Sequence, residues 1–219
     1  MSKRKQQGFT LIEIAIVLVI IGLLLGGILQ GQSLINSARV RNLISQVDGV
    51  KAAFYGFQDR YRALPGDFTQ ATTQIAGASK DGDGNGQIDA TESIAVWDHL
   101  SHAGFITGTY IYTAPPPSAT SNPTNPWNAY LQLIYDNIYA DTGTASTRHN
   151  LKTGNQIPVE VITEVDRKVD DGNALRGSIR FSLYNGGAAA PTAANCYTAA
   201  TGVWIAAGGE ANCGAAFLF

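Results

Sequence analysis

The feature that most constrains this chain is an apolar run near its amino terminus. Residues 9–29 contain one charged residue, Glu13, and they closely follow a basic cluster at residues 3–5. As a helix, this run would be about 30 Å long, which matches the hydrocarbon core of a bilayer. The positive-inside rule then predicts that residues 30–219 lie on the far side of the membrane.

A secretory signal peptide is the competing interpretation, with Gly31 and Ser33 as the small residues of a cleavage site. The run is longer than an ordinary signal-peptide core, and a carboxylate within such a segment is unfavourable, so we favour a retained helix. The cost of placing Glu13 in an apolar span predicts that it is functional. Since no Lys, Arg or His lies between Glu13 and Arg39, its counter-charge is expected from a terminus, a neighbouring chain or the membrane interface.

The segment Gly8-Phe9-Thr10-Leu11-Ile12-Glu13 lies between a short basic leader and the apolar run. It resembles the class III signal of type IV pilins and type II secretion pseudopilins. The resemblance implies that a prepilin peptidase cuts between Gly8 and Phe9 and that the new amine of Phe9 is methylated. It also implies that Glu13 attracts the amino-terminal ammonium of an adjacent subunit, an ion pair that would set the register in a low-dielectric bundle.

Gly22 and Gly26 form a small-x-x-x-small pair within the apolar run. Such a pair lets apolar helices approach closely, although glycine is also simply common in membrane helices. Many major pilins carry a helix-breaking proline near the position of Gln30, and this chain has none there. The choice between a major and a minor subunit therefore stays open.

The helical pattern continues beyond the apolar run as far as Pro65 and Gly66. Seven apolar residues follow one another at spacings of three and four, which places them on one stripe of a helix. We therefore predict one helix over residues 9–62, half in the membrane and half packed on a globular domain. A free coiled coil is the alternative, but aromatic residues at the last three positions of the stripe favour packing on a sheet. The stripe consists of Val40, Leu43, Val47, Val50, Phe54, Phe57 and Tyr61.

Residues 81–92 match the twelve-residue calcium loop of EF-hands. Gly86 stands where the loop bends sharply, and Ile88 stands where an apolar side chain points to the core. A glycine-rich acidic turn is the alternative interpretation. Because the sequence has no second such loop, we predict a single structural calcium site of weak affinity, about 10⁻⁴–10⁻³ M. The predicted ligands are Asp81, Asp83, Asn85, Gln87 through its carbonyl, Asp89 and Glu92.

The remaining pattern predicts an α+β head with a small antiparallel sheet, which is also what the pilin resemblance implies. His99 and His102 lie three apart on one predicted helix, and without a carboxylate or cysteine at a matching spacing we expect a solvated face rather than a metal site. Helices are predicted at 93–103 and 158–169, strands at 128–140, 178–184 and 215–219, a weaker strand at 203–206, and loops at 67–80 and 113–127.

Cys196 and Cys213 enclose a short segment rich in glycine and alanine. In an oxidising periplasm a bridge between them would stabilise the fold by about 3 kcal/mol. Two buried free thiols are the alternative. The resemblance supports the bridge, because many pilins carry a disulfide-bounded loop near the carboxyl end.

Composition and motifs narrow the function further. A net charge of −2, without a long block of like charges, argues against nucleic-acid binding. The chain lacks the common hydrolase, metalloprotease and phosphate-binding motifs, so we do not expect an enzyme. The expected organisation is a leader at 1–8, a transmembrane and filament-core helix at 9–29, its amphipathic continuation at 30–64 and a globular head at 65–219.

The expected function is that of a structural subunit of a type IV pilus-like filament or a type II secretion pseudopilus. The alternative is a minor or tip adhesin, or a membrane-anchored calcium-binding protein that recognises a cargo. By resemblance, the partners are other filament subunits, the prepilin peptidase, and an inner-membrane assembly platform with its ATPase. The resemblance also implies a single-pass protein of the bacterial inner membrane with a periplasmic head, which then enters a periplasmic pseudopilus or an extracellular pilus.

Overall fold

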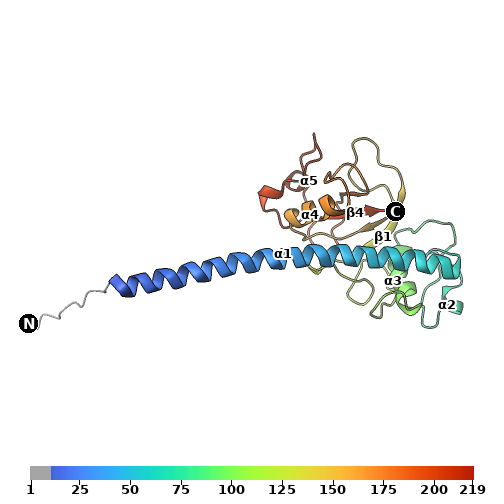
Figure 1. Cartoon of the computed structure of the whole chain (residues 1–219). Coiled ribbons are helices and arrows are strands. Elements are labelled where there is room, and N and C mark those ends of the chain that lie inside the picture. The colour runs from blue at the N-terminus through green and yellow to red at the C-terminus, as the bar shows by residue number, and fades with distance from the viewer. Residues whose placement is uncertain (1–10) are drawn as a thin grey trace, which may run out of the picture. The chain divides into compact units, whose positions relative to one another are not determined.

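A computed structural model describes residues 11–219 of the chain. The chain divides into two compact units between Arg39 and Val40. Helix α1 (Leu11–Tyr61) begins in the first unit and ends in the second (Figure 1). The predicted helix over residues 9–62 is thus confirmed for the described residues, whereas the predicted leader lies outside them.

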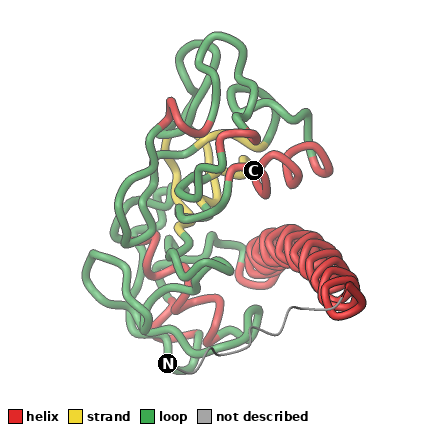
Figure 2. The backbone as a smooth tube through the Cα atoms, turned by 90° about the vertical axis from the view of Figure 1, so that its left-hand side faces the viewer, coloured by secondary structure: helices red, strands yellow, loops and turns green. Residues whose placement is uncertain are grey.

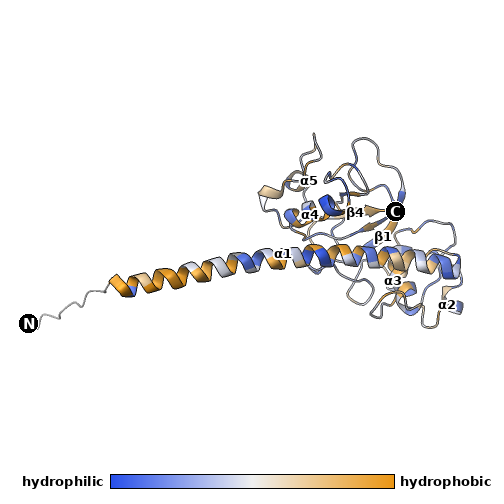
Figure 3. Cartoon of the chain, in the orientation of Figure 1, coloured by the Kyte–Doolittle hydropathy of each residue, from blue (hydrophilic) through white to orange (hydrophobic). Residues whose placement is uncertain are grey.

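The first unit contains the apolar part of α1, whose side chains over residues 11–28 are exposed. Its most apolar stretch is long and apolar enough to cross a membrane, and none of that stretch is buried within the described chain. Leu11 is 91% exposed and Leu23 is 73% exposed, and Figure 3 shows apolar residues along the first turns of α1. A continuous apolar surface of this size is unfavourable in water, so this segment requires lipid or other apolar helices around it.

In the second unit, the predicted stripe of α1 is buried in the core. Val40 and Phe57 are fully buried, and the four stripe residues between them are at most 6% exposed. Tyr61, at the end of the stripe, is partly buried against the same core. The spacing of three and four residues therefore marked the packed face of the helix correctly.

A four-stranded antiparallel sheet lies inside the head (Figure 2). Its order is β1 (Gln132–Asp136), β2 (Arg148–Lys152), β4 (Ala215–Leu218) and β3 (Ile179–Phe181). The register places one residue of each strand in a single row across the sheet. The row consists of Leu133, Leu151, Phe217 and Ile179, which are at most 2% exposed.

Two longer helices complete the head. Helix α3 (Glu92–His102) buries Ile94, Trp97 and Leu100, and helix α4 (Val159–Val169) buries Val159, Ile162 and Val165. Both predicted helices are therefore confirmed to within one residue at each end. Shorter elements are α2 (Ala71–Gln74), α5 (Ala193–Cys196) and a 3₁₀ turn, η1 (Ala206–Gly208).

The structure differs from the sequence-based prediction at several strands. The strand predicted at 128–140 is shorter, since β1 spans only Gln132–Asp136. Strand β2 was not predicted, because its sequence lacks the alternation of apolar and polar residues. The weaker strand expected at 203–206 is wrong. Val203 and Trp204 each form an isolated bridge, to Asn173 and Tyr197, and the chain then enters η1.

The disulfide between Cys196 and Cys213 is present, with the Cα atoms 5.8 Å apart. It connects α5 to the segment that precedes β4. That segment is also held by paired backbone hydrogen bonds between Ile157 and Cys213. The predicted bridge is therefore confirmed, and it restrains a part of the chain with little regular structure.

Candidate functional site

Three carboxylates lie close together beside the predicted calcium loop, and two of them belong to the loop itself. Oxygen atoms of Asp67, Asp83 and Glu92 all lie within 4.8 Å of one another. Calcium binds oxygen ligands at 2.3–2.6 Å, so two ligands of one ion are at most about 5 Å apart. The spacing of these three carboxylates fits a shared cation. Asp83 and Glu92 are the third and twelfth residues of the predicted loop.

Asp67 comes from outside the twelve-residue loop and was not among the predicted ligands. Its buried carboxylate accepts hydrogen bonds from the backbone N–H groups of Gly84, Asn85 and Gly86, at 2.7, 3.0 and 2.9 Å. Asp67 therefore holds the bend of the loop as well as facing its acids. In the sequence, Asp67 is marked only as an acid that directly follows the helix-ending Pro65–Gly66 pair. That position does not indicate a contact with residues 84–86.

Glu92 is the first residue of α3 and is also buried. One of its oxygens accepts the N–H of Asp83 at 2.9 Å, and the other accepts the N–H of Asp89 at 3.2 Å. Burial raises the pKa of Glu92, and it raises the pKa of Asp67 as well. Burial of acidic groups this close together disfavours their charged forms.

The other predicted ligands lie outside this three-carboxylate cluster. The carboxylate of Asp81 accepts the N–H and the hydroxyl of Thr72, at 2.8 and 2.9 Å, and the N–H of Thr72 lowers the pKa of Asp81. The carboxylate of Asp89 accepts the N–H groups of Thr91 and Glu92 at the start of α3. Asn85 and Gln87 are exposed, and the side-chain oxygen of Asn85 accepts the N–H of Gln87 at 2.7 Å.

Glycines allow the loop to lie against the turn that carries Asp67. A Cβ atom at Gly82 would lie 2.2 Å from the backbone of Asp67, so no other residue fits there without a shift. Gly86 has a φ of +80°, and Ile88 is fully buried. The predicted bend and the predicted inward side chain are both present.

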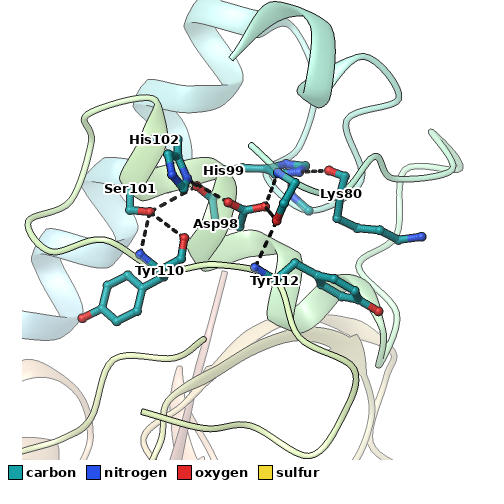
Figure 4. Close-up of polar contacts among 9 residues, drawn as sticks. Lys80, Asp98, His99, Ser101, His102, Tyr110 and Tyr112 are labelled. Atoms are coloured by element: carbon teal, nitrogen blue, oxygen red, sulfur yellow. Dashed lines mark hydrogen bonds and ion pairs between the residues drawn. The ribbon is translucent and has the colours of Figure 1, made fainter. Parts of the chain in front are cut away.

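A polar network on α3 holds the segment between Gly66 and Lys80 (Figure 4). The N–H of Gly66 donates to Nδ1 of His99 at 2.9 Å, and Nε2 of His99 lies 2.7 Å from the carbonyl oxygen of Lys80. Because Nδ1 accepts, the proton resides on Nε2, and His99 is neutral. The adjacent Asp98 accepts the N–H and the hydroxyl of Ser79, both at 2.8 Å.

The expectation that the two histidines occupy a solvated face is wrong for His99. This side chain is fully buried and its ring stacks on Phe57, with centroids 6.1 Å apart. Burial lowers the pKa of His99, because the charged form loses solvation. His102 is partly buried, with Nδ1 2.8 Å from a carboxylate oxygen of Asp98. The two rings take separate structural roles.

This network positions the candidate site. Its contacts to Gly66 and Lys80 lie one residue before Asp67 and one residue before Asp81. Helix α3 therefore fixes both ends of the intervening segment and carries Glu92 at its own first turn. Helix α3 thus carries Glu92 of the cluster and holds the residue next to Asp67.

The predicted processing and assembly residues belong to the amino-terminal segment. Gly8 and Phe9 lie outside the described residues. Glu13 lies in the first turn of α1. An ideal Cβ atom at Gly22 or Gly26 would meet no other atom within 4 Å, so both glycines leave open surface on the exposed helix. Their predicted roles in assembly remain predictions.

The arrangement of elements is that of an α+β, pilin-like protein, with a long amino-terminal helix and a small antiparallel sheet. Residues 3–29 match the family described as "Prokaryotic N-terminal methylation motif", which is the prepilin-type signal of type IV pilins and pseudopilins. Neither the curated proteins nor the solved structures include a significant match. The signal implies processing by a prepilin peptidase and assembly into a filament, and together with the apolar helix it indicates membrane anchoring.

Proposed function

We propose that this protein is a structural subunit of a type IV pilus-like filament or a type II secretion pseudopilus. The observation that carries the proposal is the prepilin-type signal at residues 3–29, which continues into an exposed apolar helix. Pilin subunits act by assembly and not by catalysis. A helix of this kind can exchange lipid for the equivalent helices of other subunits without exposing its apolar surface to water.

Glu13 would set the height of each subunit in this assembly. A carboxylate in an apolar environment is costly, about 2.5–3.5 kcal/mol on insertion scales. Cleavage after Gly8 would create an ammonium group on Phe9, and this group on an adjacent subunit would pair with Glu13. A subunit docked at the wrong height would leave both charges poorly solvated. Close helix approach at Gly22 and Gly26 would support the same packing.

The proposal includes partners and a location. Besides the prepilin peptidase, assembly would require an inner-membrane platform protein and an ATPase. Positive residues before the apolar run favour an amino terminus on the cytoplasmic side and a periplasmic head. The subunit would then leave the membrane for a periplasmic pseudopilus or an extracellular pilus.

The mass of the mature chain tests this proposal. We expect the protein isolated from membranes or sheared filaments to begin at Phe9 and to carry a methyl group on its amine. A chain that begins near Leu34, directly after Ser33, would indicate a secretory signal peptide, and a chain that retains Met1 would show that no cleavage occurs. Either result contradicts the proposal. The abundance of the chain in sheared filaments would separate a major from a minor subunit.

We further propose that the head binds one calcium ion at the loop of residues 81–92. The proposal is supported by the ligand spacing of the loop and by the convergence of Asp67, Asp83 and Glu92 within 4.8 Å. Asp67 would take part in place of, or beside, one of the predicted ligands. The ion would neutralise clustered acids and fasten the loop to α3. Its role would be structural, because a single loop lacks the paired arrangement of calcium sensors.

Chelation tests the calcium proposal. At a calcium concentration about tenfold above the Kd, binding adds about 1.4 kcal/mol to the free energy of unfolding. A chain of this size then melts about 3–6 °C higher than in EDTA. This difference should be lost in Asp67→Asn and Glu92→Gln. It should persist in Asp59→Asn, a matched change of an exposed acid on α1. Equal melting temperatures of the wild-type protein with calcium and with EDTA would contradict the proposal.

A further inference from the structure

Two large apolar side chains of α1 are exposed beyond the apolar run of residues 9–29. Leu34 is 60% exposed and Ile35 is 55% exposed. At 1.5 Å per residue, they lie about 7–9 Å past the end of the run. The headgroup layer adds about 5–8 Å to each side of the hydrocarbon core, so lipid tails do not cover these side chains. A subunit that leaves the membrane exposes them fully to water, which is unfavourable.

The head has an uncharged cavity beside α1. Its volume is about 350 Å³, and it is lined by Ser45 and Gly49 of α1, by Trp97 of α3 and by the half-buried Phe105 and Ile106. Ser45 and Gly49 are exposed, so the cavity opens at the surface. None of the described residues that line it is charged. Apolar side chains from outside can therefore enter the cavity without burying an unpaired charge.

Small residues of α1 form one wall of the cavity. A Cβ atom at Gly49 would meet no other atom within 4 Å, so the described chain leaves the helix uncovered there. One turn of α1 and a half further on, a Cβ atom at Gly56 would lie 2.9 Å from the ring of Phe105. The segment after α3 therefore lies directly against α1. Small side chains allow a second helix to approach closely, and Phe105 and Ile106 supply apolar surface for its side chains.

Assembly into a filament determines which partner can reach this cavity. The amino-terminal signal implies such assembly, and it brings copies of α1 beside one another. Residues 30–38 of α1 are uncharged, which matches the uncharged lining. In a helical filament, each contact joins two different surfaces of neighbouring copies. Ile35 and Ser45 are ten residues apart on α1 and so lie about 80° apart around it. One subunit can therefore present Ile35 to one neighbour while its cavity receives another.

We propose that the cavity receives Leu34 and Ile35 of a second copy of this chain in the assembled filament. The contact removes the two exposed side chains from water and fills the apolar walls beside Phe105 and Ile106. This inference rests on the proposed function of a filament subunit. It adds a specific contact between the helix of one subunit and the head of the next, separate from the pairing of Glu13.

Disulfide cross-linking in filaments tests the proposal. The two native cysteines are paired with each other, so each variant adds one free thiol. Full-length Ile35→Cys and Gly49→Cys are co-expressed with different carboxyl-terminal tags, and sheared filaments are oxidised with copper phenanthroline. We expect a disulfide-linked dimer that carries both tags. Asn36→Cys, also exposed on α1, should give at least about fivefold less dimer with Gly49→Cys, because its side chain points about 100° away around the helix.

Filling the cavity tests the same contact without a cross-link. A leucine fits at Gly49 without disturbing the core, since the surrounding space is open. Gly49→Leu should be incorporated into sheared filaments at a level at least about fivefold lower than the wild type, because its side chain occupies the place of Leu34 and Ile35. Asp48→Leu adds an apolar side chain at the neighbouring exposed residue, which does not line the cavity, and should be incorporated normally. Both variants should keep the melting temperature of the wild type.

Filament yield, measured in the same samples, separates this inference from the proposed function. The inference alone is overturned if filaments form but contain no Ile35–Gly49 dimer, or if Asn36→Cys cross-links equally well. It is also overturned if Gly49→Leu is incorporated as well as Asp48→Leu, or if Gly49→Cys is joined only to a different protein. Failure of the wild-type chain to form filaments contradicts the proposed function, and this inference falls with it.

Discussion

Asp166 is a buried acid on α4 whose environment favours its neutral form. Its carboxylate accepts the indole N–H of Trp204 at 2.6 Å and the N–H of Gly172 at 3.2 Å. Burial raises the pKa of Asp166 from its ordinary value of 3.8 to about 6, and the nearby charges of Asp170 and Asp171 add to this rise. The folded chain therefore binds a proton at Asp166 more tightly than the unfolded chain does.

This shift predicts a pH dependence of stability. The pKa of Asp166 is higher in the folded state, so protonation of Asp166 stabilises the fold. This contribution to the free energy of unfolding is fully present below about pH 4 and is lost as the pH rises through about 6. The side chain of Asp166→Asn does not titrate, so this variant should not lose stability for this reason as the pH rises. Its free energy of unfolding relative to the wild type should increase by about 2–3 kcal/mol between pH 4 and pH 7.5.

Thermal or denaturant unfolding of both proteins across this pH range measures the difference. Asp171→Asn is the matched control, since Asp171 is exposed and contributes only a minor part of the shift. It should retain most of the wild-type pH dependence. A difference between Asp166→Asn and the wild type that does not change with pH would show that Asp166 is charged in the folded state.

The sequence predicts the positions of some residues of the candidate site and not of others. Gly86 and Ile88 take the expected places, because the loop is a local structure whose bend and side-chain directions follow from spacing. Asp67 and His99 could not be predicted in the same way. Their contacts join α3 and the loop to a turn that only folding brings beside them.

At the level of elements, strand β2 shows how tertiary contacts override sequence pattern. It is a central strand, paired with β1 on one side and β4 on the other, although it contains Asn150 and Lys152. Both residues are buried and both contact Asp136 on β1, Asn150 at 2.9 Å and Lys152 through an ion pair. Burial lowers the pKa of Lys152, and its contact with Asp136 opposes this effect. A polar strand can therefore be central because its partner strand supplies the counter-charge.

The disulfide between Cys196 and Cys213 restrains helix α5. We expect the double variant Cys196→Ala/Cys213→Ala to lose about 3 kcal/mol of stability, because the unfolded chain gains the freedom of the opened loop. For a chain of this size, this corresponds to a melting temperature lower by about 6–12 °C. Reduction with dithiothreitol should lower the melting temperature of the wild type and leave the double variant unchanged. If the double variant melts as the wild type does, the bridge does not contribute to stability.

At the level of the whole molecule, the sequence combines a membrane-compatible helix with a folded head in one chain. The proposed assembly depends on Glu13 in the first of these parts. Glu13→Ala should still be cleaved after Gly8, but it should be incorporated into sheared filaments at a level at least about tenfold lower than the wild type. Asp59→Ala, a change of an exposed acid near the end of α1, should be incorporated normally. Normal incorporation of Glu13→Ala would contradict the role of this carboxylate in assembly.

The sequence by itself determined the features that depend on neighbours along the chain. These are the apolar run and its basic leader, the packed stripe of α1, helices α3 and α4, and the glycine bend of the acidic loop. Tertiary structure decided the placement of Asp67 beside that loop, the burial of His99, the central position of β2, and the cavity beside Trp97. Each of these requires residues distant in sequence to meet. Their free energies come from desolvation and from hydrogen bonds that exist only once the core has formed.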